Sequence, residues 1–241
     1  MRFKTSLSLT IVLFVLAMIF ARLGLWQLER KADKEELFRQ FESAPSLDLR
    51  EALVSSIPFT RVRATGRFDR ERHFLQDNRM LFGRPGVHVL TPFDFGGREQ
   101  VLVNRGWLPM AADRRSLPAV QTDGAQREIS GRMVPFNTAG PRLGEADRLA
   151  RDEWPQLVTY LDRRPAAEAL GAPIAGWIIL LDSDQPDGFE GRQWQPAVME
   201  PAVHGGYALQ WFSLSAAAII IWLVLGFRKG SSAERGKPGT V

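Results

Sequence analysis

The stretch from Leu7 to Leu25 reads LSLTIVLFVLAMIFARLGL, and a second apolar run, from Tyr207 to Phe227, reads YALQWFSLSAAAIIIWLVLGF. Each run has the roughly 20 apolar residues that a helix needs to cross a hydrocarbon layer about 30 Å thick. Neither run alternates between apolar and polar side chains as a membrane barrel strand does. The sequence therefore predicts two membrane-spanning helices, over residues 7–27 and 207–227.

Basic residues flank both runs on the sides nearest the ends of the chain. Residues 1–6 contain Arg2 and Lys4, and residues 228–241 contain four Lys or Arg side chains. Short tails rich in Lys and Arg stay in the cytoplasm. We therefore expect both termini to be cytoplasmic, with a disordered tail over residues 228–241, and an outer domain over residues 28–203 on the other side of the membrane.

The formal net charge of +4 reflects these tails rather than a nucleic-acid surface. Residues 28–203 contain 24 Lys and Arg against 26 Asp and Glu, a net charge of −2, so we expect no nucleic-acid partner. The absence of cysteine excludes disulfides, thiolate metal sites and a cysteine nucleophile. A cleaved signal peptide is an alternative for the first run, but no A-x-A site follows it, which favours a retained anchor.

The outer domain has the pattern of a mainly antiparallel β structure with a few short helices. Residues 59–68 alternate between apolar and basic side chains, as a half-buried strand does. Residues 86–95 and 100–107 are joined by Gly-Gly-Arg-Glu and predict a hairpin. Further strands are expected over residues 73–77, ending in a turn at Asp77–Asn78, and over residues 128–135 and 177–182.

Two helices are expected in this region. Residues 29–41 are charged and helix-favouring and should extend the first span, whereas residues 161–170 form a short helix begun near Asp162 and stopped by Gly171. The fold class is therefore an α+β membrane protein, in which two transmembrane helices flank a mainly antiparallel β domain. The order of the strands does not follow from the pattern.

Signatures of common enzymes are missing from the sequence. It contains no G-x-S-x-G, P-loop or H-E-x-x-H motif, and its three histidines are far apart. We therefore expect no enzymatic activity. Asp182, Asp184 and Asp187 form a loose cluster that suggests a calcium loop, but they lack its glycine and distal glutamate, which favours a solvated turn.

The outer ends of the two predicted spans bring together residues suited to a flat amphiphilic ligand. Because the spans run in opposite directions, Arg22, Trp26 and Gln27 reach the same depth as His204, Tyr207 and Trp211. In a haem site of this kind, His204 would hold the iron and Arg22 would pair with a propionate. The alternative is an ordinary aromatic belt, with an interfacial histidine and an Arg22 that extends to the headgroups.

The segment VNRGW gives a second candidate site, within the outer domain. Val101 and Val103 should point to the core, Asn104–Arg105–Gly106 should make a turn, and Trp107 should pack across the end of the sheet. The alternative to this structural role is a polar contact from Asn104, Arg105 and Trp107 to a partner or to haem.

Five segments resemble the Surfeit locus protein 1 family of cytochrome c oxidase assembly factors. They are LGLWQLERK (23–31), FTRVRATGRFD (59–69), GVHVLTPF (86–93), VLVNRGWLP (101–109) and HGGYALQWFSL (204–214). They follow the family order over nearly the whole chain. The chain departs from the family at Gly205–Gly206, where members often read N-N-H-L-x-Y, and this departure leaves a continuous helix and the ligand role of His204 open.

The resemblance implies a multi-pass protein of the bacterial inner membrane whose central domain is periplasmic. It also implies a non-enzymatic role in which haem a is bound and delivered to subunit I of a haem-copper oxidase, with haem a synthase as an additional candidate partner. The family histidine maps onto His204, with Trp211 close by. A different possibility is a cofactor-free scaffold that stabilises an oxidase assembly intermediate.

Overall fold

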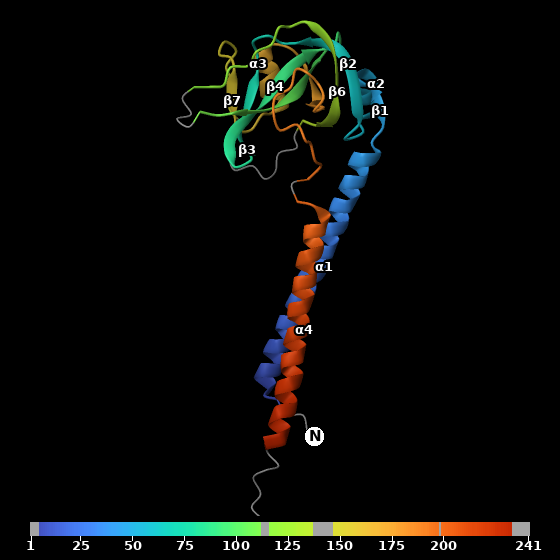
Figure 1. The fold of residues 1–241 in the computed structure, drawn as a ribbon, viewed down its shortest axis with the longest axis vertical. Helices are drawn as coiled ribbons and strands as arrows, with labels where there is room; N and C mark the ends of the chain where they lie inside the picture. Colours follow the sequence, from blue (N-terminus) through green and yellow to red (C-terminus); the bar gives the residue numbers. More distant parts are fainter. Residues whose placement is uncertain (1–4, 112–115, 137–146, 198, 233–241) are drawn as a thin grey trace, which may run out of the picture. The chain divides into compact units, whose positions relative to one another are not determined.

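The computed structural model describes residues 5–111, 116–136, 147–197 and 199–232, with the side chains described up to residue 227. The chain divides into two compact units. The first unit contains the helices near the two termini, and the second, residues 40–195, contains the β-strands (Figure 1). The predicted fold class, two terminal apolar helices flanking a β-rich domain with a few short helices, is confirmed.

The helical unit consists of α1 (Leu7–Ser43), up to Arg39, and α4 (Pro201–Ser232). The predicted extension of the first span through residues 29–41 is confirmed, and the helix ends just before Ala44–Pro45. Gly205 and Gly206 do not interrupt α4, which begins at Pro201, a favoured residue for the first turn of a helix. His204 therefore lies on the same continuous helix as Trp211.

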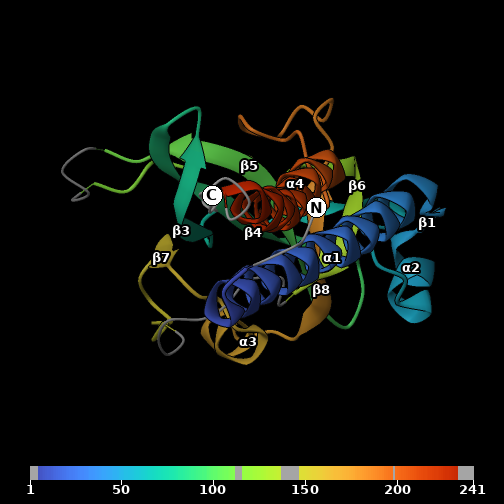
Figure 2. The same cartoon turned by 90° about the horizontal axis from the view of Figure 1, so that it is seen from below.

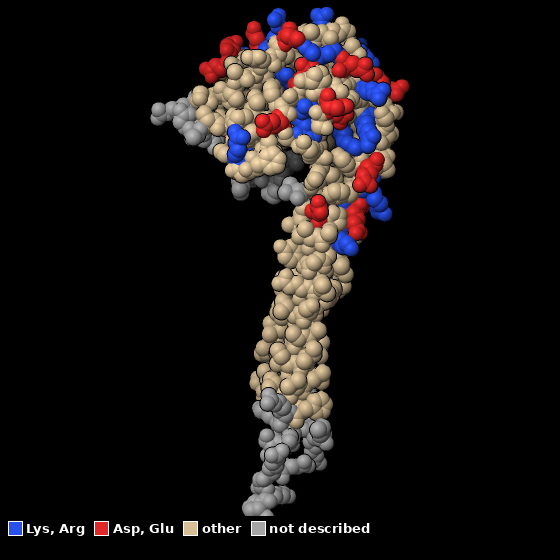
Figure 3. Space-filling view, in the orientation of Figure 1, with Lys and Arg blue, Asp and Glu red and all other residues tan. Residues whose placement is uncertain are grey.

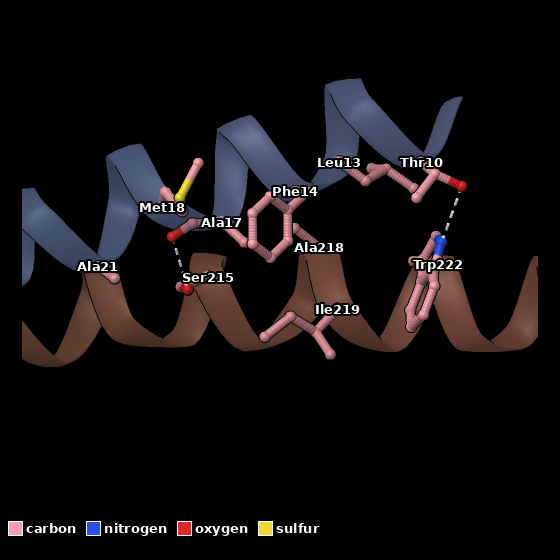
Figure 4. A pocket seen from close by; sticks show the side chains of 10 residues that line it. All are labelled: Thr10, Leu13, Phe14, Ala17, Met18, Ala21, Ser215, Ala218, Ile219 and Trp222. Carbon is pink, nitrogen blue, oxygen red and sulfur yellow. Dashed lines mark hydrogen bonds between the residues drawn. The ribbon is translucent and has the colours of Figure 1, made fainter. Parts of the chain in front are cut away.

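Small residues allow the two helices to pack side by side (Figure 2). Ala17 and Gly24 of α1 and Ala208, Ser215 and Ala218 of α4 are buried, at spacings of seven and three residues that keep them on one face of each helix. The Ser215 hydroxyl donates a hydrogen bond to the carbonyl oxygen of Ala17 at 2.9 Å (Figure 4). Close approach and a buried polar contact thus hold α1 to α4.

The outer surfaces of the helical unit are apolar. Both helices are long and apolar enough to cross a membrane, and most of their large apolar side chains are exposed. On the face shown in Figure 3, these helices have a long stretch without charged side chains, whereas Lys, Arg, Asp and Glu are spread over the β-rich unit. Insertion into a bilayer would cover this apolar surface.

A closed barrel forms the centre of the β-rich unit. The strands pair in the order β1-β2-β6-β8-β5-β4-β3-β7, and a further antiparallel pairing of β2 with β4 closes the barrel. Most neighbours are antiparallel, but three pairs are parallel: β5–β8 within the barrel, and β1–β2 and β3–β7 at the ends of the strand order. The strands are β1 (Ser46–Asp48), β2 (Arg61–Phe68), β3 (Phe74–Leu81), β4 (Arg84–Asp94), β5 (Gln100–Pro109), β6 (Gln126–Pro135), β7 (Gln156–Val158) and β8 (Ile174–Leu181).

The barrel core is made by the inward side chains of these strands. Burial alternates along the whole of β2, as its sequence predicts, and Phe93, Val101 and Met133 are fully buried in the same cluster. The helix α2 (Leu49–Ser55) adds Leu49 and Ala52 to this cluster. The predicted β4–β5 hairpin is confirmed. The short helix is confirmed as α3 (Arg163–Leu170), with Asp162 at its N-cap and Gly171 in the left-handed region.

Two predicted turns are wrong. The strand β3 does not end at Asp77–Asn78 but continues to Leu81. Asn78 takes a left-handed conformation (φ 59°) at the irregularity where the register of β3 against β4 shifts, so the chain bends there without leaving the sheet. Asn104–Arg105–Gly106 lies inside β5. There the Asn104 side chain accepts a hydrogen bond from the Gly106 amide at 3.1 Å, and Gly106 (φ 110°) absorbs the distortion without leaving the sheet.

Candidate functional site

A hydrogen bond joins the two helices at His204. Its Nδ1 lies 2.8 Å from Oε1 of Gln27, which is almost completely buried on α1. His204 lies in the first turn of α4, four residues before the buried Ala208, so it belongs to the face that packs on α1. The predicted juxtaposition of Gln27 and His204 is therefore present in the structure.

The hydrogen bond sets the tautomer of the His204 ring. An amide oxygen only accepts, so Nδ1 carries a hydrogen, and in the neutral ring Nε2 then has the lone pair. Nε2 is buried and has no hydrogen-bond partner in the part of the chain that the structure describes. A buried acceptor of this kind costs about 1–3 kcal/mol when it is left unpaired. Neutral imidazole with a free Nε2 is also the form that binds a metal.

Aromatic side chains pack two turns farther along the same interface. The Trp211 ring stacks on Phe20 with 5.8 Å between ring centroids and 26° between ring planes. Phe20 was not predicted as part of the site, although it lies seven residues before Gln27 and hence on the same helix face. Phe212 was also missed; a Cβ on Gly24 would lie 2.7 Å from its ring.

The other predicted residues of this site lie on more exposed faces of the helices. Arg22 pairs with Glu29 at 3.7 Å, and about two thirds of each side chain is exposed. The Arg30 guanidinium lies 5.9 Å from the Trp26 ring centroid. Trp26 and Tyr207 are 41 % and 45 % exposed. Gln27, His204 and Trp211 thus form the interhelical part of the candidate site, and Arg22, Trp26 and Tyr207 are available to a ligand or to lipid.

The VNRGW residues are buried in the β-rich unit. Arg105 donates hydrogen bonds to the carbonyl oxygens of Asp187 (2.7 Å) and Gln121 (3.4 Å) and to the hydroxyl of Thr122 (2.6 Å). Its guanidinium lies 4.9 Å from the centroids of both the Phe68 and Phe189 rings. Burial lowers the pKa of Arg105 to about 10, although the charge of Asp187 acts in the opposite direction.

The neighbours of Arg105 also make internal contacts. The Asn104 amide donates to Nδ1 of His88 at 3.3 Å, and the Trp107 indole donates to the carbonyl oxygen of Arg79 at 2.9 Å. Burial lowers the pKa of His88 to about 4, and the charge of Arg79 adds to this effect. These contacts give Asn104, Arg105 and Trp107 a structural role, and partner binding by them stays a prediction.

Two of the three aspartates that suggested a calcium loop have other contacts. Asp187 pairs with Arg127 at 2.9 Å, and Asp182 accepts a hydrogen bond from Ser130 at 2.7 Å. Within the described ranges, no group of three or more His, Cys, Asp or Glu side chains is placed to hold a metal ion. The contacts of Asp182 and Asp187 are those of structural side chains.

Comparison with known proteins identifies the family. The SURF1 family model matches residues 14–216, a range that contains the Gln27–His204 pair and the VNRGW segment. The chain belongs to the SURF1 family. A SURF1-like protein of Rickettsia felis is 25 % identical over 92 % of this chain and 96 % of its own length. A SURF1-like protein of Monosiga brevicollis is 29 % identical over 87 % of this chain and 84 % of its own length.

A mycobacterial relative has a comparable extent of similarity. An uncharacterised SURF1-like protein of Mycobacterium tuberculosis is 26 % identical and covers 98 % of this chain, which in turn covers 88 % of that protein. The similarity therefore includes both apolar helices and the β-rich unit between them.

Proposed function

We propose that this SURF1 family protein is a membrane-anchored assembly factor for haem-copper terminal oxidases, and that it binds haem a through His204 before haem a is delivered to oxidase subunit I. The observation that carries this proposal is the buried, unpartnered Nε2 of an imidazole whose other nitrogen is fixed by Gln27. Membership of the family supports the role in oxidase assembly.

The residues present fit a haem ligand set. Haem a supplies an iron that accepts an imidazole nitrogen, a flat apolar ring and two propionates. In metal-binding histidines, the ring nitrogen that does not bind the metal usually donates a hydrogen bond to a protein oxygen, which orients the ring and raises its basicity. The hydrogen bond from His204 Nδ1 to Gln27 is of this kind. Trp211 supplies an aromatic surface two helical turns from His204. The exposed guanidinium group of Arg22 suits a carboxylate such as a propionate.

Iron reaches Nε2 only if the side chains that cover it move. The aliphatic stem of Lys31 lies near Gly205, the residue after His204, because a Cβ at Gly205 would be 3.6 Å from Cδ of Lys31. Lys31 makes a half-exposed ion pair with Glu35 at 3.5 Å. Exposed ion pairs contribute roughly 0–1 kcal/mol, so displacing Lys31 costs little.

The proposed topology places this site at the periplasmic boundary of the bacterial inner membrane. The basic tails at both termini favour the cytoplasm, and two spans then return the chain to its starting side. A site at this boundary faces both the bilayer, which dissolves haem a, and integral partners such as subunit I and haem a synthase. We propose this arrangement as the reason the chain has two anchors.

The test is to co-express the chain with the enzymes of haem a synthesis and to measure haem in the purified protein by the pyridine haemochrome assay. The wild type should retain haem a, and His204→Ala should lose most of it and lower oxidase activity in membranes. Leu209→Ala, on the same helix and 70 % exposed, is the matched control and should behave as the wild type.

Two outcomes would reject haem binding at this site. One is a His204→Ala variant with the haem content of the wild type. The other is a wild type that co-purifies with an oxidase subunit but carries no haem a, as a cofactor-free scaffold would. Loss of haem in the Leu209→Ala control as well would also count against the proposal, because the effect would then not belong to His204.

A further inference from the structure

A pocket on the outer side of the barrel gathers arginine side chains. It has a volume of about 410 Å³ and lies over β2, β6 and the residues that follow β8. Arg61, Arg132 and Arg192 line it together with Asp182 and Asp184. All of these residues belong to the β-rich unit. The pocket is separate from the His204 site, and no role has been given to it so far.

Two of the arginines lie directly opposite each other in the sheet. Arg61 on β2 and Arg132 on β6 are partners in the antiparallel register. Like charges in such a pair destabilise a sheet. Among the described residues, neither guanidinium has a carboxylate oxygen within 4.0 Å. The pair thus places two positive charges side by side without a direct counter-charge.

Neutral groups hold the second and third arginines in place. One nitrogen of Arg132 donates to the carbonyl oxygens of Phe41 (2.6 Å) and Phe59 (3.4 Å), and the guanidinium stacks on the Phe41 ring at 3.8 Å. Arg192 donates to the carbonyl oxygens of Phe189, Asp182 and Gln185. Carbonyl oxygens orient these two guanidinium groups but carry no net charge that would neutralise them.

The electrostatic balance of the pocket is positive. Burial lowers the pKa of Arg132, and the repulsion from Arg61 exceeds the opposing attraction from Asp182. The Asp182 carboxylate is already bonded to the Ser130 hydroxyl at 2.7 Å. Three arginines against two aspartates leave the lining with a net charge of +1. An anion would relieve the repulsion between Arg61 and Arg132.

We propose that this pocket binds a phosphate group. Arginine forks match phosphate oxygens, and a tetrahedral dianion offers acceptors to several forks, whereas a carboxylate has only two oxygens and suits a single fork. Arg132 and Arg192 form the fixed part of the site. Arg61, which is exposed and makes no hydrogen bond to another described side chain, closes on the ligand. The phosphate comes either from solution or from a phospholipid headgroup.

Calorimetric titration of the full-length protein in detergent with inorganic phosphate tests the proposal. Arg61→Ala should weaken phosphate binding about tenfold, the value of one charge-assisted hydrogen bond. Arg63→Ala is the matched control, since Arg63 is exposed on the same face of β2 but does not line the pocket, and it should change binding less than twofold. Asp184→Asn should tighten binding, because it removes a repelling charge.

The source of the phosphate is distinguished by a second titration with monomeric short-chain phosphatidic acid. Tighter binding of this lipid than of inorganic phosphate, weakened by Arg61→Ala, assigns the site to a headgroup, and tighter binding of inorganic phosphate assigns it to a soluble ligand. The proposal is overturned if neither probe binds at millimolar concentration, if Arg61→Ala binds as the wild type does, or if acetate binds as tightly as phosphate. These outcomes are independent of haem binding at His204.

Discussion

Gln27 Oε1 and His204 Nδ1 lie 2.8 Å apart although 177 positions separate these residues in the sequence. The bond crosses from α1 to α4 and leaves the buried Nε2 of His204 as a free acceptor. In the proposed function, Gln27 would determine which ring nitrogen is available to the haem iron. It would act through His204 rather than by contact with the ligand.

Replacing Gln27 tests this positioning role. Gln27→Leu removes the acceptor for Nδ1–H, so the ring loses its fixed tautomer, and we expect haem affinity to fall by about 10- to 100-fold, as for other second partners of metal-binding histidines. The measurement is haem retention together with the Soret spectrum, whose band should change position or width. Leu28→Ala, next in sequence and 43 % exposed, should leave both unchanged. Unaltered spectra in Gln27→Leu would contradict this role.

The contact between Gly24 and Phe212 gives a prediction for helix packing. Any side chain at residue 24 would meet the Phe212 ring, since even a Cβ would lie 2.7 Å from it. We expect Gly24→Leu to destabilise the helical unit by about 1–3 kcal/mol. Gly206→Leu is the matched substitution, because no atom lies within 4 Å of a Cβ at residue 206. It should be neutral or stabilise α4 by up to about 1 kcal/mol.

Thermal unfolding in detergent, followed by circular dichroism, compares these two variants. The double variant Gly24→Leu/Phe212→Ala should recover part of the lost stability, because it removes the ring that a leucine displaces. Equal stability of Gly24→Leu and Gly206→Leu would show that α1 and α4 do not pack through Gly24.

Arg105 is expected to stabilise the β-rich unit. Arg105→Ala leaves two carbonyl oxygens and the Thr122 hydroxyl without their donor and should lower the free energy of unfolding by about 2–4 kcal/mol. Arg105→Lys should recover only part of this free energy, because the lysine ammonium lacks the planar guanidinium group that donates to several acceptors in fixed directions. Arg63→Ala, an exposed arginine on β2, is the control. Urea denaturation measures the effect, and wild-type stability of Arg105→Ala would instead favour a binding role.

The histidines of the β-rich unit predict a loss of stability in acid. Burial lowers the pKa values of His73 and His88 to about 4, below the ordinary value of 6.5. Between pH 6.5 and 4 the unfolded chain therefore binds more protons than the folded one, and the free energy of unfolding falls as the pH falls. Protonation of His88 also removes the acceptor for the Asn104 amide.

Urea midpoints at pH 7, 5.5 and 4.5 test this dependence. The wild type should lose more stability than His88→Gln over this range, since glutamine does not titrate. The expected difference is on the order of 1–3 kcal/mol for a shift of this size. If the two proteins lose the same amount of stability as the pH falls, the lowered pKa of His88 does not contribute to the acid sensitivity.

Local patterns predicted much of the fold. The apolar runs, the alternation in β2, the β4–β5 hairpin and the capping of α3 all depend on neighbouring residues, so they could be read from the chain. Matching the depth of the two spans also put Gln27 and His204 at one level, although it did not predict the hydrogen bond between them. The strands and helices could be predicted because their periodicity, turn residues and caps are local features of the sequence.

Features that depend on distant segments could not be predicted. The burial of Arg105 needs acceptors from Gln121 and Asp187, and the polar triplet Asn104–Arg105–Gly106 therefore looks like a turn when it is read alone. Three elements, β1, α2 and β7, were not anticipated, and β1 and β7 are three-residue strands, too short to show alternation. The parallel pairing of β5 with β8 depends on tertiary packing.

Titration of haem a into the purified full-length protein in detergent, followed at the Soret band, measures binding at His204. We expect saturable binding to the wild type and at least about tenfold weaker binding to His204→Ala, since losing an axial ligand costs at least as much as losing its hydrogen-bond partner. Leu209→Ala should match the wild type. Equal affinity of His204→Ala and the wild type would contradict the assignment of Nε2 as the iron ligand.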